Sequence, residues 1–260
     1  MATIYDIDLR SEAPAIDIRG LSVRFGSREA VKNVSLQVPT QGVVSFIGAS
    51  GCGKTTLLKS LNRMNDLNEE AEVTGEVLLG GKNIYAEGVD PIQVRARVGM
   101  VFQRPAPFPQ SIFDNVAFGP RVNHVSGDLN QIVEDALRKA DLWTEVGHRL
   151  SDSALKLSGG QQHRLCIARA LALTPDVLLM DEPASELDPQ ETRNIEDLIL
   201  GLREEYTVLV VTQNLQHAAR VSDFTAYLAA GELVEYGPTD AVFTNPRVPA
   251  TEAFITGRFS

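Results

Sequence analysis

The chain is poor in the residues that build disulfide frameworks and membrane spans. Of its 260 residues only two are cysteines, Cys52 and Cys166, and their spacing fits neither a disulfide framework nor a zinc site. No apolar run approaches the roughly 20 residues that a membrane span needs, and the first residues do not follow the order of a signal peptide. We therefore expect a chain that works in a reducing, cytosolic compartment, where any membrane role is peripheral.

Positive charge is scarce as well. Lys and Arg number 24 against 34 Asp and Glu, which gives a formal net charge of -10. This balance opposes accumulation on a phosphate backbone, and no run of Lys and Arg supplies a local basic patch. We therefore predict no nucleic-acid partner. An anionic nucleotide would need a local concentration of positive charge, which a lysine, a magnesium ion and helix N-termini can supply.

The length and the 43% hydrophobic content suffice for one large domain or for one core with an inserted subdomain. Residues 1–14 mix charged and small side chains and predict a loose N-terminal arm. Residues 15–260 form the folded domain in this interpretation. Between about 105 and 173 apolar residues recur at helical spacing, which predicts a helical subdomain inserted into the core. Its expected helices cover residues 112–118, 129–140 and 159–173.

Two kinds of strand are expected outside this insert. Residues 34–38 and 73–79 are short β-rich runs, which indicate an antiparallel sheet. Residues 177–180 and 208–211 are unbroken apolar runs, as expected for parallel strands that are covered on both faces. Residues 224–235 predict a closing hairpin, with short helices after it. The pattern as a whole predicts an α/β fold.

The clearest chemical motif is a glycine-rich loop at residues 48–55, which fits the spacing G-x-x-x-x-G-K-[ST]. In this motif backbone N–H groups surround phosphates, Lys54 reaches the terminal phosphates and the Thr55 hydroxyl binds magnesium. An apolar run at 43–47 precedes the loop and a helical pattern follows it, so an ordinary glycine turn is the weaker interpretation. Within the loop, Cys52 is better explained as a small filler residue than as a reactive thiol. The predicted nucleotide-binding residues are Gly48, Ala49, Ser50, Gly51, Cys52, Gly53, Lys54, Thr55 and Thr56.

A second glycine-rich segment, residues 157–161, opens the long helix expected after it. Its two glycines allow the backbone to approach an anion closely while the N–H groups of the helix start point outward. Taken alone, the segment could be a flexible turn. Together with the first loop it predicts that a nucleotide contacts two loops. The residues assigned to this second contact are Ser158, Gly159, Gly160 and Gln161.

Two carboxylates, Asp181 and Glu182, follow the buried strand expected at 177–180. They would lie at the carboxyl edge of a parallel sheet, where α/β proteins bind ligands. Asp181 can hold Mg²⁺ against the phosphates, and Glu182 can orient the attacking water or accept its proton. The alternative is a solvated acidic pair at a strand end. Because a phosphate loop lies upstream, we favour the catalytic interpretation.

Taken with Gln103 and the segment 185–188, these motifs resemble those of ATP-binding-cassette ATPases, in an order that covers nearly the whole chain. The resemblance implies a P-loop NTPase (RecA-like) core with an antiparallel β subdomain and an inserted helical subdomain. It also implies ATP and Mg²⁺ as cofactors.

Stretches outside the catalytic motifs are similar to the ATPase subunits of bacterial phosphate-specific importers. This similarity implies a peripheral ATPase at the cytoplasmic face of the inner membrane, which powers uptake of inorganic phosphate through separate transmembrane permease subunits. A phosphate-binding protein would be an indirect partner. Two alternatives stay open, namely import of another small solute such as amino acids, and a slow nucleotide-gated scaffold or regulator. The similar stretches are residues 61–67, 99–105, 107–109, 164–171, 231–237 and 256–259.

The resemblance further implies a head-to-tail dimer, in which the 158–161 loop of one chain covers the ATP held by residues 48–56 of a second copy. It implies that Gln103 lies near magnesium and senses whether the γ-phosphate is present. It also adds Asp188 to the nucleotide contacts. Phe25 would stack on adenine, with packing in the core as the rival interpretation. The expected catalytic residues are Glu182, Lys54 and Gln213, and the expected metal-binding residues are Thr55, Gln103 and Asp181.

The sequence departs from the family pattern at two positions. Gln213 stands where these ATPases usually carry a histidine, and a carboxamide cannot protonate, so we expect slow but real hydrolysis. Glu186 stands where alanine is common, and its charge could weaken dimer closure or pair with a basic residue across the seam. His217 points the same way as Gln213 one helical turn on, but too far along to reach the phosphate. His163 is expected on an exposed helix face.

Overall fold

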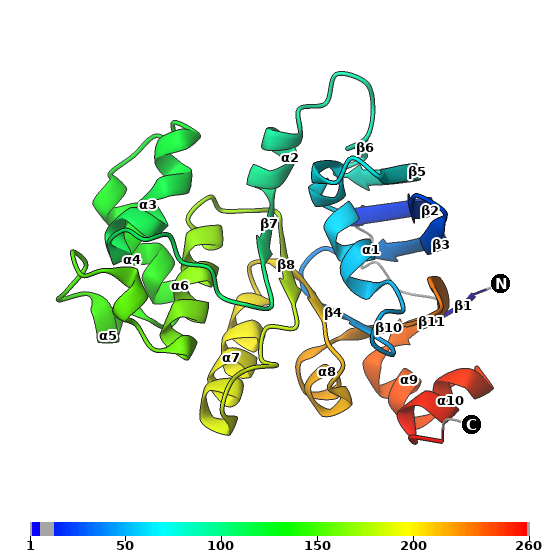
Figure 1. Ribbon diagram of the computed structural model, residues 1–260. Helices are drawn as coiled ribbons and strands as arrows, with labels where there is room; N and C mark the ends of the chain where they lie inside the picture. The colour runs from blue at the N-terminus through cyan, green and yellow to red at the C-terminus, as the bar shows by residue number, and fades with distance from the viewer. Residues whose placement is uncertain (1, 6–12, 259–260) are drawn as a thin grey trace.

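The computed structural model describes residues 2–5 and 13–258, and in this part of the chain the strands form two sheets (Figure 1). The larger sheet contains, in spatial order, β1 (Thr3–Ile4), β11 (Glu232–Pro238), β10 (Phe224–Ala229), β4 (Gly42–Ile47), β9 (Thr207–Val211), β8 (Val177–Asp181) and β7 (Val98–Val101). The smaller sheet contains β3 (Arg28–Val38), β2 (Ile16–Phe25), β5 (Ala71–Leu79) and β6 (Lys82–Asn83).

The centre of the larger sheet is parallel, since β10, β4, β9, β8 and β7 run in one direction. Along β8, Leu178 and Met180 join one apolar cluster, whereas Val177 and Leu179 join another. Successive side chains of a strand point to opposite faces, so both faces of this sheet are covered. The unbroken apolar runs predicted this arrangement, and it is confirmed. The carboxyl ends of these strands therefore share one edge, where the loops after β4, β7, β8 and β9 meet.

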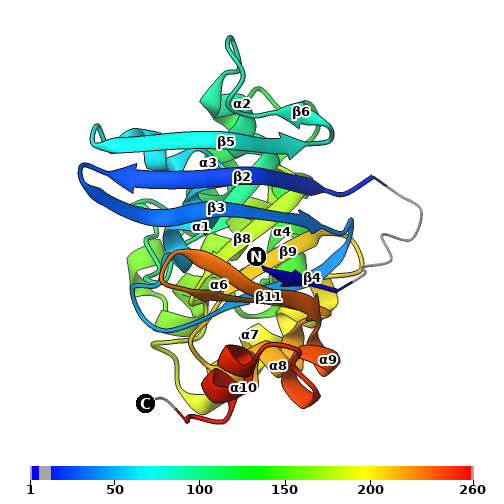
Figure 2. The same cartoon turned by 90° about the vertical axis from the view of Figure 1, so that its right-hand side faces the viewer.

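The smaller sheet is antiparallel, as predicted from the β-rich runs at 34–38 and 73–79. In Figure 2 the strands β5, β2 and β3 run across the view, higher than β4 and β9 of the larger sheet. Ile16 and Ile18 of β2 and Leu36 of β3 pack into the apolar cluster that covers one face of the parallel strands. The antiparallel sheet is therefore part of the same core and brings the start of β3 near the phosphate loop.

Three of the helices, α3, α4 and α6, correspond to those expected at 112–118, 129–140 and 159–173. They pack on one another and, with α5, gather on the side of the molecule away from the antiparallel sheet (Figure 1). No helix in the described ranges has the length and hydropathy to span a bilayer. The helices are α1 (Lys54–Ser60), α2 (Pro91–Arg97), α3 (Ile112–Val122), α4 (Leu129–Lys139), α5 (Trp143–Val146), α6 (Gly159–Leu171), α7 (Pro189–Leu202), α8 (Leu215–Val221), α9 (Thr239–Thr244) and α10 (Pro249–Ile255), with short 3₁₀ turns at Met64–Leu67 and Ala154–Lys156.

The start of the chain corrects one prediction. Residues 3 and 4, expected in a loose arm, form β1 and pair in parallel with β11. The Tyr5 hydroxyl donates to Oε1 of the buried Glu235 at 2.9 Å, and the Arg247 guanidinium lies over the Tyr5 ring. A two-residue strand is too short to leave a periodic pattern in the sequence, so the pattern could not reveal it. Residues 6–12 of the predicted arm lie outside the described residues, as do residues 259–260 of the predicted domain.

Candidate active site

The phosphate loop joins the end of β4 to the start of α1, and its shape requires glycine at two positions. Gly48 has φ +150° and Gly53 has φ +109°. A Cβ atom at Gly48 would lie 2.2 Å from the Leu228 carbonyl oxygen, and one at Gly53 would lie 2.3 Å from that of Ala30. Any other residue would therefore clash with the backbone and be strained. The strand–loop–helix setting predicted for this motif is present.

Lys54 is the first residue of α1 and is only 5% exposed. Its Nζ donates to the carbonyl oxygens of Gly48 at 2.8 Å and Ala49 at 3.0 Å. An ammonium group carries three donors. The loop carbonyls accept from two of them and hold the group over the loop, and the third donor has only a long contact of 3.9 Å to the Cys52 sulfur, a weak bond that an anion in the pocket can replace.

Thr55 connects the phosphate loop to the end of β8. Its hydroxyl donates to Oδ1 of Asp181 at 2.9 Å. Burial raises the pKa of Asp181, while the Thr55 hydrogen bond and the charges of Lys59 and Lys54 act in the opposite direction. A hydroxyl and a carboxylate side by side are the oxygen donors that Mg²⁺ prefers, with phosphates and water completing its shell. The two residues present here therefore fit a magnesium ion.

Glu182 follows β8 directly and has a left-handed backbone, with φ +49°. Its Oε2 accepts a hydrogen bond from the Gln213 backbone N–H at 3.2 Å. Its Oε1 is buried and has no partner among the described residues. Non-glycine residues in this conformation carry a backbone cost of about 1–3 kcal/mol and cluster at functional sites. Seven other non-glycine residues in the described part of the chain share this conformation, so the place of Glu182 at the carboxyl edge of the sheet, and not its backbone, supports a functional role.

Lys54, Thr55 and Glu182 line a pocket of about 290 Å³ at the sheet edge, whereas Asp181, which accepts from Thr55, is not part of the lining. Because β7, β8 and β9 are parallel neighbours, Gln103, Glu182 and Gln213 meet in its wall, as the sequence analysis expected. Phe25 lines the pocket and also packs against the core. Its surroundings therefore fit both a ring available to adenine and a ring packed in the core. Stacking on adenine stays a prediction. The lining residues are Phe25, Arg28, Ala30, Ser50, Gly51, Gly53, Lys54, Thr55, Thr56, Gln103, Glu182 and Gln213.

The sequence analysis missed Arg28 and Ala30 in this lining. Arg28 opens β3 directly after the turn that follows Phe25, and its exposed guanidinium adds positive charge at the pocket. A single arginine in a β-rich run carries no motif. Its place after an aromatic residue and a glycine turn was the only signal that could have pointed to it.

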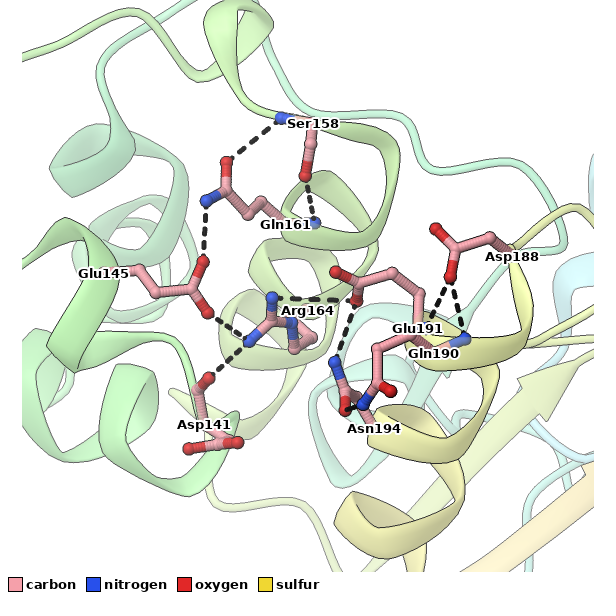
Figure 3. Close-up of polar contacts among 9 residues, drawn as sticks. All are labelled: Asp141, Glu145, Ser158, Gln161, Arg164, Asp188, Gln190, Glu191 and Asn194. Atoms are coloured by element: carbon pink, nitrogen blue, oxygen red, sulfur yellow. Dashed lines mark hydrogen bonds and ion pairs between the residues drawn. The ribbon is translucent and has the colours of Figure 1, made fainter.

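The second glycine-rich segment begins α6 and is not part of the lining of that pocket (Figure 3). The Ser158 Oγ accepts from the Gln161 backbone N–H at 3.2 Å, and the Gln161 Oε1 accepts from the Ser158 N–H at 3.1 Å. This capping box fixes the helix start. Gly160 lies against the Glu191 side chain, since a Cβ atom there would lie 2.3 Å from the Glu191 carboxylate, which would have to shift to admit it. Asp188 caps α7 through its Oδ1, which accepts from the N–H groups of Gln190 and Glu191, and it too lies outside the pocket lining.

Arg164 joins the helical side of the molecule to α7 and is only 4% exposed (Figure 3). Its guanidinium donates to Oε1 of Glu145 at 2.6 Å and to the Asp141 carbonyl oxygen at 2.7 Å. It also forms an ion pair with Glu191 at 3.7 Å. Burial raises the pKa of Glu145, but hydrogen bonds from Gln161 and Arg164 outweigh it and leave that pKa below its ordinary value.

The structure bears on two expectations about single side chains. The prediction that His163 lies on an exposed face is wrong, because the residue is 1% exposed on a helix packed between the sheet and α3 and α4, and its burial lowers its pKa to about 4. Glu186 has a basic partner within its own chain, since its Oε1 lies 3.3 Å from the Nε of Arg104. Both side chains of this pair are largely exposed, so it contributes little to stability. Gln103 donates to the Ser185 hydroxyl at 3.3 Å.

A parallel sheet with a phosphate loop at its carboxyl edge defines an α/β nucleotide-binding domain. A model of the ABC transporter family matches residues 31–185, so the chain belongs to that family. It is 54% identical over 253 residues to "Phosphate import ATP-binding protein PstB 1" of Synechococcus sp. (strain JA-3-3Ab), covering 94% of this chain and 92% of that protein. The protein of the same name from Synechococcus sp. (strain JA-2-3B'a(2-13)) is 53% identical with the same coverage.

Solved structures agree with this assignment. The cbiO1 protein of Clostridium perfringens, described as part of the ABC transporter complex cbiONQ, matches with a TM-score of 0.78 at 24% identity and covers 95% of this chain and 97% of its own. The ATP-binding cassette MJ0796, in a dimeric structure of a post-hydrolysis state bound to ADP and Pi, matches with a TM-score of 0.73 at 26% identity, covering 86% and 98%. The expected ABC ATPase fold is therefore confirmed.

Proposed function

We propose that the chain is the ATP-hydrolysing subunit of an importer and powers the uptake of inorganic phosphate through separate transmembrane permease subunits. The observation that carries this proposal is the 54% identity to a phosphate import ATP-binding protein along 94% of the chain. Segments outside the nucleotide motifs share in that identity, and these segments, rather than the phosphate loop, differ between importers of different solutes. The site of action is the cytoplasmic face of the membrane, and a phosphate-binding protein delivers the cargo to the permease.

The residues at the sheet edge divide the chemistry between them. Lys54 and the loop N–H groups hold the phosphates of ATP, and Thr55 and Asp181 would hold the magnesium ion, which neutralises charge on the β- and γ-phosphates when bound. Glu182 orients the attacking water and accepts its proton. Gln213 donates a neutral hydrogen bond toward the γ-phosphate. Because that bond lacks the charge of a protonated imidazole, hydrolysis is slow.

Two copies arranged head to tail would complete the site. The N–H groups of Gly159 and Gly160 lie in the first turn of α6, where no helical acceptor exists for them. Facing the phosphates of a second copy, they would form charge-assisted hydrogen bonds. An ATP molecule held in this way favours the closed pair, and its hydrolysis releases the pair. The dimeric MJ0796 structure with ADP and Pi supports this arrangement, and the helical subdomain at about 105–173 would transmit closure to the permease.

The test combines hydrolysis with uptake. Purified protein should hydrolyse Mg-ATP slowly, and cells lacking the chain should regain phosphate uptake when it is returned but not when Lys54→Ala or Glu182→Gln is returned. Absence of hydrolysis, together with nucleotide binding, would favour the scaffold or regulator. Hydrolysis without any effect on phosphate uptake would favour another cargo, which uptake of labelled amino acids would then identify.

A further inference from the structure

The antiparallel sheet contributes Phe25, Arg28 and Ala30 to the wall of the phosphate pocket. Phe25 ends β2 and Arg28 begins β3, and the two are direct partners across the two-residue turn between these strands. The side chains of such a pair point to the same face of the sheet, with Cβ atoms about 4.5–5.5 Å apart. Ala30 follows Arg28 by two positions along β3, so it shares that face. The three residues therefore face the pocket together.

The contacts of β3 place Arg28 between Phe25 and the phosphate loop. β3 has β2 on one side and contacts α1 and β11 on the other, and Figure 2 shows it between β2 and the larger sheet. Arg28 on β3 is therefore nearer to the loop than Phe25 on β2. At the loop itself, a Cβ atom at Gly53 would lie 2.3 Å from the Ala30 carbonyl oxygen. Arg28 precedes Ala30 by two residues, roughly 7 Å along the strand, so it does not reach the loop backbone as Ala30 does.

The Arg28 guanidinium is available to an anion in this pocket. It is exposed, and no hydrogen bond or ion pair engages it within the described part of the chain. Lys54, the other cation of the lining, already donates to the carbonyl oxygens of Gly48 and Ala49. A guanidinium carries five N–H donors in a planar fork, which matches the geometry of a phosphate group. Arg28 thus offers the pocket a second positive charge, at a place that the phosphate loop does not cover.

We propose that Arg28 is a nucleotide-binding residue whose guanidinium contacts the α-phosphate of ATP. The inference rests on the proposed function, since it needs a nucleotide in this pocket with adenine near Phe25 and the terminal phosphates on the loop. Between these two ends a nucleotide has only its ribose and its α-phosphate, and of these only the α-phosphate is charged. The α-phosphate is the same before and after hydrolysis. Arg28 therefore strengthens the binding of ATP and ADP alike, which lowers KM and leaves the chemical step to the groups at the sheet edge.

The experiment measures the affinity of the full chain for AMP and for ADP, each in competition with a fluorescent ADP analogue. We expect Arg28→Gln to weaken both about tenfold, because a charge-assisted hydrogen bond is lost and AMP retains the α-phosphate. Arg28→Lys keeps the charge and should lose less. Arg24→Gln is the matched control, since Arg24 is also exposed and has no partner among the described residues. It precedes Phe25, so it points to the other face of the sheet, and it does not line the pocket. Its affinities should stay within about twofold of the wild type.

Salt and turnover give two further readouts. Because the contact is exposed and ionic, the difference between wild type and Arg28→Gln should shrink to about threefold in concentrated salt. The ratio kcat/KM for ATP should fall about tenfold in Arg28→Gln, and the fall should come from KM. Because Arg28 is exposed and unpartnered in the described part of the chain, its variants should keep the wild-type unfolding temperature.

Wild-type affinity for AMP in Arg28→Gln would overturn the inference, even if ADP binding falls, since the contact would then be to the β-phosphate. A loss that salt does not reduce would assign Arg28 to the base or the ribose and would overturn it too. Equal losses in Arg28→Lys and Arg28→Gln would contradict a contact carried by charge. If the wild type binds no ADP, or if Lys54→Ala keeps the wild-type affinity for ADP, the proposed function has failed and not this inference alone.

Discussion

Replacing Gln213 by histidine tests how much of the turnover depends on the side chain at the end of β9. The contact between this residue and Glu182 is made by the Gln213 backbone N–H, which any residue except proline retains. The Gln213 side chain is exposed and lines the phosphate pocket. The substitution therefore changes the side chain in the pocket wall that we propose faces the γ-phosphate, and it leaves the backbone contact to Glu182 intact.

The expected size of the effect follows from the charge of the new hydrogen bond. Hydrogen bonds to charged groups contribute about 1.5–3 kcal/mol, against about 0.5–1.5 kcal/mol for neutral ones. A difference of about 1 kcal/mol in the transition state raises kcat roughly five- to tenfold. The affinity for ATP should stay nearly constant, because the contacts of Lys54, Thr55 and the loop are untouched.

The assay is steady-state phosphate release at saturating Mg-ATP, with nucleotide affinity measured separately by equilibrium binding. Gln216→His is the matched control, since Gln216 is an exposed glutamine on α8 that is absent from the lining of the phosphate pocket. It should leave kcat unchanged. Equal turnover in Gln213→His and wild type would refute the reasoning, and so would an equal rise in Gln216→His.

Three further results are expected. Glu182→Gln should trap an ATP-bound dimer that is visible by size-exclusion chromatography at saturating Mg-ATP, and persistent monomer would count against the head-to-tail pair. Gly48→Ala should abolish ATP binding and lower the unfolding temperature, because its Cβ would lie 2.2 Å from the Leu228 carbonyl oxygen. Arg164→Met should lower the free energy of unfolding by about 2 kcal/mol at neutral pH, because it removes the charged donor that bonds to the partly exposed Glu145 and to the Asp141 carbonyl. Since the pKa of Glu145 is lowered in the fold, the stability it contributes is present above about pH 4.5 and is lost at lower pH. Urea unfolding of this variant and the wild type should therefore converge in acid, and a constant gap would contradict this.

Much of the phosphate site could be predicted from the sequence because its geometry is local. The spacing of Gly48, Gly53 and Lys54 specifies one loop conformation between a strand and a helix. Glu182 and Gln213 are far apart in the sequence, but their proximity could still be predicted. Each follows an apolar run typical of a buried parallel strand, and the carboxyl ends of parallel strands share one edge of the sheet. Recognition of the strand type was enough to place both residues there.

Other features depend on packing that no local pattern reports. The two residues of β1 pair with a strand more than 200 positions away, so neither length nor period marks them. His163 and Arg164 were polar residues in a helix, and such residues usually face solvent. They are buried because α6 is covered by the sheet on one side and by α3 and α4 on another.

The contacts of Arg164 connect two parts of one chain that the proposed mechanism uses, namely the 158–161 loop and the segment that leads from α7 back to Glu182. A buried ion pair is poor evidence for stability, since desolvation opposes the Coulomb attraction, but it restricts geometry strongly. Here Arg164 ties the first half of α6 to the start of α7 through Glu191 (Figure 3), and the Glu191 carboxylate also lies against Gly160. A partner nucleotide that binds the N–H groups of Gly159 and Gly160 would therefore pull on α7 as well, and on the segment before it that contains Glu186 and leads back to Glu182. If the 158–161 loop covers the ATP of a second copy, as proposed above, these contacts would join that loop to the segment that carries Glu182 in the same chain.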